Sequence, residues 1–328
     1  MKLLRCISVL AYCVFGVVFN SASANESPAK SYPTEAPFTH LSNTDEQWFD
    51  DWQRNITQTF HLQAQTLDAW FSPTDLPSDK ASAYGKVRLG WEPRSGDWSN
   101  IEPRFKIGLR LPSLKHKVDV LLSDDEDNYL DDALNVSREL QTQKDNTTLA
   151  LRYFSPRNDK ISYRVGFGRR DQVFARSTYQ DYHRFSPKMN LLYEGRVYYY
   201  NRDGWGTEAG ASLLLERTGT KLDRFSHRWY FEDKTNRFKW NIEAQRYYRL
   251  SAQSTFVLNA YAQGFSRPNM HTEHIYMSAK LRSNPLRPWL FFEIEPFVLW
   301  LKEEDFRRSY GLALRFEGFF GDNANFQF

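Results

Sequence analysis

Cysteine is almost absent from this sequence, and both cysteines lie near its start. Cys6 and Cys13 fall inside a segment with the features of a secretory signal: a basic beginning, an apolar run over 7–18 and a small-residue cleavage site at 22–24. We therefore expect residues 1–24 to be removed, which leaves a mature chain without a thiol. Such a chain has neither a disulfide framework nor a cysteine metal site.

Long hydrophobic runs and an excess of charge of one sign are also missing. After the signal, no segment approaches the roughly 18 apolar residues of a spanning helix, and the mean hydropathy is -0.65. A membrane barrel has the same properties, because only every second residue of its strands faces lipid. The 43 basic residues fall to 41 without Lys2 and Arg5, against 40 acidic ones, so no nucleic-acid partner is expected.

Strict alternation of apolar and polar residues is abundant, together with an aromatic content of 16%. In 289–300 the even positions are apolar and Glu293 and Glu295 lie between them, which is typical of a strand. Eleven steps of about 3.3 Å, tilted by about 40°, rise about 28 Å, close to the roughly 25 Å apolar band of membrane barrels. After a charged turn at 302–305, a second alternating run over 309–320 completes a β-hairpin.

The same period of two continues back to residue 81 and predicts an all-β fold, a closed antiparallel transmembrane β-barrel of about 14 strands. An even number of strands brings both chain ends to one side of the membrane, expected to be the periplasm. Twelve strands are the alternative, because two runs alternate poorly and Arg246 falls on the lipid side. The predicted strands are 81–91, 101–111, 117–123, 146–154, 161–170, 173–185, 190–201, 206–217, 225–232, 238–250, 254–265, 272–282, 290–301 and 309–320.

One helical segment precedes the strands. Thr44 and Gln47 have the spacing of a capping box, and apolar residues then recur every three or four positions. This amphipathic helix is either a plug or periplasmic lid, or it packs its apolar stripe on the rim of the barrel. The predicted organisation is a signal peptide at 1–24, a flexible lead at 25–43, the helix at 44–72, the barrel at 81–320 and a tail at 321–328.

These features together resemble the Gram-negative bacterial outer-membrane β-barrel proteins. The closing run 310–316 is similar to the C-terminal assembly signal of that class, although the chain continues to Phe328. The resemblance implies location in the bacterial outer membrane with both ends in the periplasm. It also implies contacts with outer-membrane lipid, lipopolysaccharide and the barrel-assembly machinery, and no cofactor. The oligomeric state is left open.

Charged residues dominate the face that points inward in this arrangement. They favour a porin-like passive channel, whose wall selects small polar or anionic solutes. They equally suit a lattice of cross-strand salt bridges, such as Glu295 beside Arg315, in a structural or assembly barrel with a self-closed lumen. The candidate wall residues are Arg88, Arg104, Lys106, Arg110, Arg152, Arg164, Arg228, Lys239, Glu293, Glu295, Arg315 and Glu317; Arg170, Lys280, Arg282, Glu194, Glu208 and Glu243 share their face.

The long loop at 124–145 begins with six carboxylates in nine residues. Three interpretations are open: a calcium site, although the loop lacks the glycine and the distant glutamate of an EF-hand; an inward fold that narrows the pore, as in general porins; or a solvated loop near lipopolysaccharide head groups. The candidate constriction residues are Asp124, Asp125, Glu126, Asp127, Asp131 and Asp132.

No catalytic residue is predicted, and an outer-membrane lipid or lipopolysaccharide-modifying enzyme, such as a lipid hydrolase, is the third alternative. Three short patterns hold the residue types of hydrolases or metal sites: His40 with Ser42, Ser226 with His227, and His271 and His274 around Glu273. The first precedes the helix and lies outside every strand. The second places its two side chains on opposite faces of a strand. The third is a weak indication of metal, and no metal site is predicted.

Overall fold

The structure is a computed structural model that describes residues 43–71, 81–96, 101–111, 118–123, 148–155, 160–168, 172–267 and 269–321, together with Trp98 and Asn158. The chain divides into two compact units, 1–47 and 48–328, and the second contains all the described strands. The predicted signal, most of the lead, the acidic loop and the tail beyond residue 321 lie outside the described residues.

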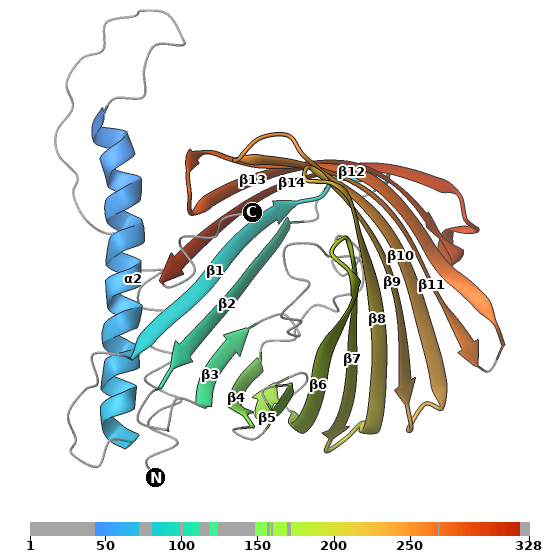
Figure 1. Ribbon diagram of the computed structural model, residues 1–328, viewed down its shortest axis with the longest axis horizontal. Coiled ribbons are helices and arrows are strands. Elements are labelled where there is room, and N and C mark those ends of the chain that lie inside the picture. Colours follow the sequence, from blue (N-terminus) through green and yellow to red (C-terminus); the bar gives the residue numbers. More distant parts are fainter. Residues whose placement is uncertain are drawn as a thin grey trace, which may run out of the picture. The chain divides into compact units, whose positions relative to one another are not determined.

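Fourteen strands form one closed antiparallel barrel, in which each strand pairs with the next and β1 pairs with β14 (Figure 1). This confirms the predicted fold class and shows that the twelve-strand alternative is wrong. The strands are β1 Ser82–Trp91, β2 Ile101–Arg110, β3 Val118–Ser123, β4 Thr148–Phe154, β5 Ile161–Gly168, β6 Gln172–Ser186, β7 Met189–Tyr200, β8 Gly204–Thr218, β9 Lys221–Glu232, β10 Arg237–Arg249, β11 Ser254–Arg267, β12 His271–Arg287, β13 Leu290–Leu301 and β14 Arg308–Gly321.

The two faces of this sheet differ sharply. The hydroxyl of Tyr84 on β1 accepts a hydrogen bond from Arg152 Nη2 on β4 at 3.2 Å, across two intervening strands, which identifies their shared face as the concave one. The opposite, outward face presents exposed apolar side chains, as the alternation predicts. Examples are Val87, Leu89, Leu151, Val165, Phe167, Val197, Phe225, Ile242, Met277, Ile294 and Phe316.

Helix α2 (Asn43–Phe71) contacts the rim at which β1 begins and β14 ends. The backbone N–H of Ala83 donates to His61 Nδ1 at 3.1 Å, and that of Gly321 donates to Thr57 Oγ1 at 3.3 Å. At the end of β12, Arg287 Nε donates to Asp50 Oδ1 of the helix at 2.9 Å. Within the described part of the chain, no helix is long and apolar enough to cross a membrane.

The helix also makes an aromatic contact with β14, the strand on which the barrel closes against β1. The ring of Phe60 stacks on that of Phe320, with centroids 5.1 Å apart and an interplanar angle of 19°. Phe320 shares the outward face with Phe316, because alternate residues on a strand point the same way and the two are four positions apart. The contact therefore lies on the outside of the barrel wall, as the rim-packing interpretation expects.

Two strand boundaries differ from the prediction by more than two residues. Strand β9 begins at Lys221 and not at residue 225, because its early residues pair with β8 across a two-residue turn. Strand β12 continues through Arg287, so the predicted end of this strand at residue 282 is wrong. The register with β13 shifts between Ser283 and Arg287, where Pro285 has no N–H to donate. Such an irregularity extends a strand while interrupting its alternation.

Aromatic rings cover glycines on neighbouring strands. Gly108 lies directly opposite Tyr84, and a Cβ added to it would lie 2.2 Å from a carbon of the Tyr84 ring. This close approach requires glycine. Gly206 under Tyr198 and Gly311 under Phe297 repeat the arrangement.

Candidate functional site

The register places all the predicted wall residues on the inward face. Directly opposite residues of an antiparallel pair share a face, so each pair extends the inward row to the next strand. Arg110 lies opposite Asp119, which in turn lies opposite Arg152. The remaining predicted residues follow from the pairs Arg152 with Arg164, Arg88 with Arg104, Lys86 with Lys106, Arg88 with Glu317, Glu293 with Arg315, Gly210 with Arg228, and Tyr230 with Lys239; Glu295 is two positions from Glu293.

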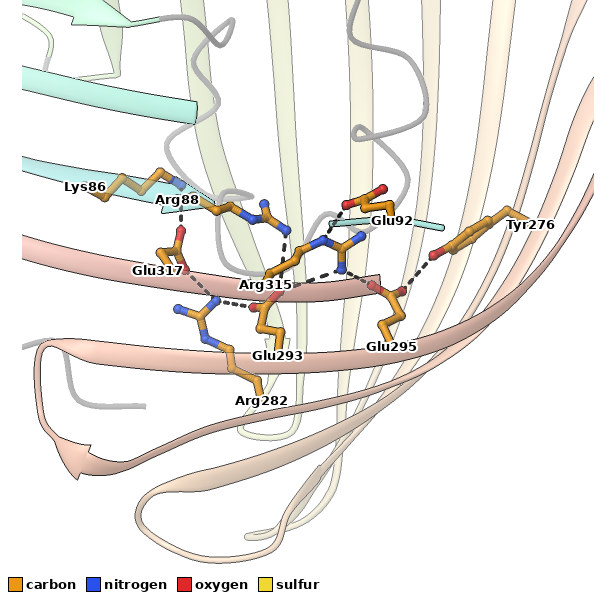
Figure 2. A network of polar contacts seen from close by, with 9 residues as sticks. All are labelled: Lys86, Arg88, Glu92, Tyr276, Arg282, Glu293, Glu295, Arg315 and Glu317. Carbon is orange, nitrogen blue, oxygen red and sulfur yellow. Dashed lines mark hydrogen bonds and ion pairs between the residues drawn. The ribbon is translucent and has the colours of Figure 1, made fainter. Parts of the chain in front are cut away.

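Nine inward side chains from the last strands and the beginning of the barrel form one buried network (Figure 2). Glu317 is 3.3 Å from Lys86 Nζ and 2.7 Å from Arg282 Nη1. Arg282 also pairs with Glu293, which lies 3.4 Å from Arg88 Nη2. The members are Lys86, Arg88, Glu92, Tyr276, Arg282, Glu293, Glu295, Arg315 and Glu317. We call this set the seam network, since it joins β12, β13 and β14 to β1.

Arg315 is the junction of the seam network. Its Nε donates to Glu92 Oε1 at 2.7 Å, its Nη1 pairs with Glu295, and Nη1 lies 3.8 Å from Glu293 Oε2. Glu295 also accepts a hydrogen bond from the Tyr276 hydroxyl at 2.9 Å. The residues Arg315 and Glu295 are 2% and 0% exposed. With four acidic and four basic members, the seam network is formally neutral, so its charges hold one another in place.

A second network joins β6 to β9. Arg196 donates to Glu194 Oε2 and to Glu208 Oε2, each at 3.0 Å, and Arg228 Nη1 lies 2.7 Å from Glu194 Oε1 and 3.2 Å from Glu208 Oε1. Gln180 Nε2 donates to Glu194 at 3.0 Å. Two arginines and two glutamates thus alternate as a closed square, which also balances its charge. The salt-bridge lattice that the sequence offered as one interpretation is present here and at the seam.

Between these networks the inward wall is basic. Arg152, Arg164 and Arg176 lie directly opposite one another on β4, β5 and β6, and we call them the arginine row. At the β3 end of this row, Asp119 Oδ2 accepts from Arg152 Nη2 at 2.8 Å. Arg176 Nη2 donates to the Tyr200 hydroxyl at 3.2 Å. Like charges directly opposite each other are unfavourable in a sheet unless anionic groups lie near them.

A cluster of polar side chains without a formal charge lies on the inward face of β11 and β12. The Tyr261 hydroxyl donates to Gln263 Oε1 at 2.7 Å, and the Tyr261 ring stacks on His274 at 5.5 Å. Within the described residues, the amide group of Asn259 and the hydroxyl of Ser278, directly opposite it, have no hydrogen-bond partner. Buried polar groups of this kind are usually satisfied by ordered water.

The short patterns weighed as catalytic or metal sites do not come together. Ser226 bonds Ser212 on the inward face, whereas the His227 ring stacks on Trp229 on the outward face. Glu273 contacts His271 Nε2 at 2.5 Å, but the adjacent His274 points to the other face. The pattern at His40, Arg170 and the acidic loop from Asp124 to Asp132 lie outside the described residues.

Several residues of the networks were missed by the wall prediction. Arg176 and Arg196 lie on strands whose alternation is interrupted by tyrosines, so the inward parity was not evident there. Asp119 lies on a short strand, and Glu92 lies just after β1. Their partners come from strands that are distant in sequence, and no local pattern indicates such pairs.

Comparison with known proteins shows similarity of fold only. No protein-family model matches the chain, and neither does any curated protein sequence. Among solved structures, the outer membrane channel DcaP of Acinetobacter baumannii is 9% identical, covers 73% of this chain and 97% of its own, and gives a TM-score of 0.44. A loop L8 deletion mutant of OmpT, an outer membrane protein of Vibrio cholerae, is 8% identical, with coverages of 74% and 99% and a TM-score of 0.49. The KdgM porin in complex with disordered oligogalacturonate is 8% identical, with coverages of 71% and 98% and a TM-score of 0.36.

Proposed function

We propose that this protein is a passive channel for small polar solutes in the bacterial outer membrane, with a preference for anions. The observation that carries the proposal is the contrast between the two faces of one closed sheet. Its outward face presents exposed leucine, valine and phenylalanine side chains, and its inward face is charged and polar. A soluble barrel has no reason to expose such a band, whereas a bilayer covers it.

The arginine row supports the anion preference. Arg152, Arg164 and Arg176 place three positive charges in direct register on one part of the wall, and Asp119 is paired with the first of them. Rings or rows of basic side chains favour anions in pores.

A second candidate function is a structural barrel whose lumen is closed by its own side chains. The burial of the seam network favours it, since Glu295 and Arg315 are almost inaccessible. In this alternative the ion pairs hold the wall and no solute passes. In the channel, the loop at 124–132 is proposed to narrow the pore, and the helix 43–71 is proposed to control access from the rim.

Recordings from the purified chain in planar lipid bilayers test the proposal. A channel gives discrete conductance steps, and a salt gradient gives a reversal potential on the anion side. The same recordings are made on a variant lacking 43–71 and on a variant lacking 124–145. Silence of all three supports the structural barrel and overturns the channel, whereas conductance that appears only in one deletion identifies that segment as the barrier.

The bacterial partners follow from the same proposal. The outward face contacts outer-membrane lipid and lipopolysaccharide, and the closing strand β14 is the segment that the barrel-assembly machinery reads. In this orientation the rim that holds both ends of the barrel faces the periplasm, as in single-chain bacterial barrels.

A further inference from the structure

Three charged residues lie together on the outward face, at the rim of β8, β9 and β10. Arg217, Asp223 and Arg246 lie on the same face as the exposed Phe225 and Ile242. The sequence already showed Arg246 on the side expected to meet lipid. A membrane barrel that exposes charge on this face needs a partner for it, because a charge on the lipid side is costly.

The three side chains form a preorganised clamp. Asp223 Oδ2 accepts from Arg217 Nε at 2.8 Å, and its two oxygens accept from Arg246 Nε at 2.6 Å and from Arg246 Nη2 at 3.1 Å. The Asp223 side chain is 2% exposed, whereas the side chains of Arg217 and Arg246 are 59% and 51% exposed. The carboxylate therefore fixes two guanidinium groups whose outer edges face away from the wall.

The height of the clamp corresponds to the edge of a bilayer. Asp223 is the third residue of β9, directly after the turn at 219–220. The next outward residue along β9 is Phe225, about 7 Å further up the wall at about 3.3 Å per residue. Apolar side chains thus begin immediately above the arginines, and the turn with its aqueous surroundings lies immediately below.

We propose that Arg217 and Arg246 bind the phosphodiester head group of an anionic phospholipid in the leaflet beside the rim that holds the turn at 219–220. Each guanidinium carries five N–H donors in a planar fork, and Asp223 uses one donor of Arg217 and two of Arg246. The remaining donors suit phosphate oxygens, which arginine binds in pairs. Two arginines against one aspartate leave a net positive charge, which matches a lipid phosphate at the level where acyl chains begin.

The proposal rests on the proposed function insofar as both need a membrane barrel, but it does not need an open lumen.

A second polar group on the same face provides a matched control. Lys160 Nζ lies 2.8 Å from Asp181 Oδ2, whose carboxylate also accepts from the hydroxyls of Tyr179 and Tyr193. This hydrogen bond raises the pKa of Lys160, because it stabilises the ammonium form. Lys160 is thus an outward cation near the same rim with a single positive charge and no second arginine.

Native mass spectrometry of the detergent-purified full chain tests the clamp, with phosphatidylglycerol as the probe. Diacylglycerol with the same acyl chains reports binding without phosphate, and a large excess of inorganic phosphate reports competition by the free ion. The variants are Arg217→Gln, the double variant Arg217→Gln with Arg246→Gln, and Lys160→Gln as control. Mobility of unheated samples on gels verifies that each forms the folded barrel before lipid is added.

We expect the native chain and Lys160→Gln to retain phosphatidylglycerol and not diacylglycerol, even with excess inorganic phosphate. Arg217→Gln should weaken retention about tenfold, and the double variant further, since one charge-assisted contact contributes about one order of magnitude. Equal retention by the double variant overturns the clamp, as does an equal loss in Lys160→Gln. Displacement by inorganic phosphate would assign the site to the free ion, and absence of a folded barrel would count against the proposed function itself.

Discussion

Arg164 of β5 lies directly opposite Arg152 of β4 on one side and Arg176 of β6 on the other. Like charges at directly opposite positions of neighbouring strands destabilise a sheet. The barrel keeps the arrangement on its inward face, next to two networks that cancel their own charge. We therefore expect the arginine row to determine ion preference.

Replacing the central residue tests this expectation. Arg164→Gln should lower the anion-to-cation permeability ratio about twofold, because a unit charge about 8 Å from a passing ion in water contributes about 0.5 kcal/mol. Arg164→Glu should lower the ratio further. Reversal potentials in a potassium chloride gradient measure the ratio. Arg217→Gln on the outward face is the control, and a shift of equal size in it would contradict a lumenal origin of selectivity.

The seam network makes a prediction about stability. Glu295→Gln should lower the free energy of unfolding by about 3 kcal/mol, since it leaves the buried Arg315 without its closest anion. Tyr276→Phe removes only the hydroxyl that donates to Glu295 and should cost about 1 kcal/mol. Urea unfolding of the barrel in lipid vesicles, followed by tryptophan fluorescence, measures both. Equal effects of the two variants would show that the charge of Glu295 is not what matters.

The helix contact can be tested by truncating one ring. Phe60→Ala removes the stack on Phe320 and should destabilise the barrel by about 2 kcal/mol, the contribution of burying a phenylalanine side chain. The temperature at which the unheated gel form converts to the heated form should fall accordingly. Leu62→Ala serves as the matched control, because Leu62 is 61% exposed on the same helix. A similar fall in both variants would argue against a specific seam contact.

A side chain at position 108 should clash with a neighbour on the inward wall. Gly108→Ala places a methyl group 2.2 Å from the Tyr84 ring, which must then leave its position beside Arg152. A cost of about 1–3 kcal/mol is expected, the usual range for overpacking. Gly195→Ala adds a methyl group that meets nothing within 4 Å and should be nearly neutral. Adding Tyr84→Ala to Gly108→Ala should restore part of the loss, and no restoration would refute the steric explanation.

The amino-acid sequence predicts the barrel well because alternation is a local property. Each strand of 289–320 shows which of its faces is apolar, so the inward position of Glu293, Glu295 and Arg315 followed without knowledge of the fold. The helix followed in the same way from its capping box and apolar spacing. Its contact with the rim at Phe320 did not, because a stripe does not identify its partner.

Pairing between distant strands could not be predicted locally. Arg315 bonds Glu92 across 223 positions, and Arg88 bonds Glu293 across 205, both through the closure of β1 on β14. The register of that closure decides which acid meets which base. Likewise, the position of Arg246 on the lipid side does not fit the alternation of its own strand. The explanation lies on β9, which begins at Lys221 and so places Asp223 directly opposite Arg246. A residue that breaks an alternating pattern can therefore indicate a partner on the neighbouring strand.

The most direct test of the central claim is the current through single molecules of the purified chain in a planar lipid bilayer under a salt gradient. A channel with a charged inward wall predicts stepwise conductance and a reversal potential displaced toward anions. Sustained silence from protein that shows the heat-dependent gel shift of a folded barrel, both in the native chain and without 43–71 or 124–145, would contradict the channel.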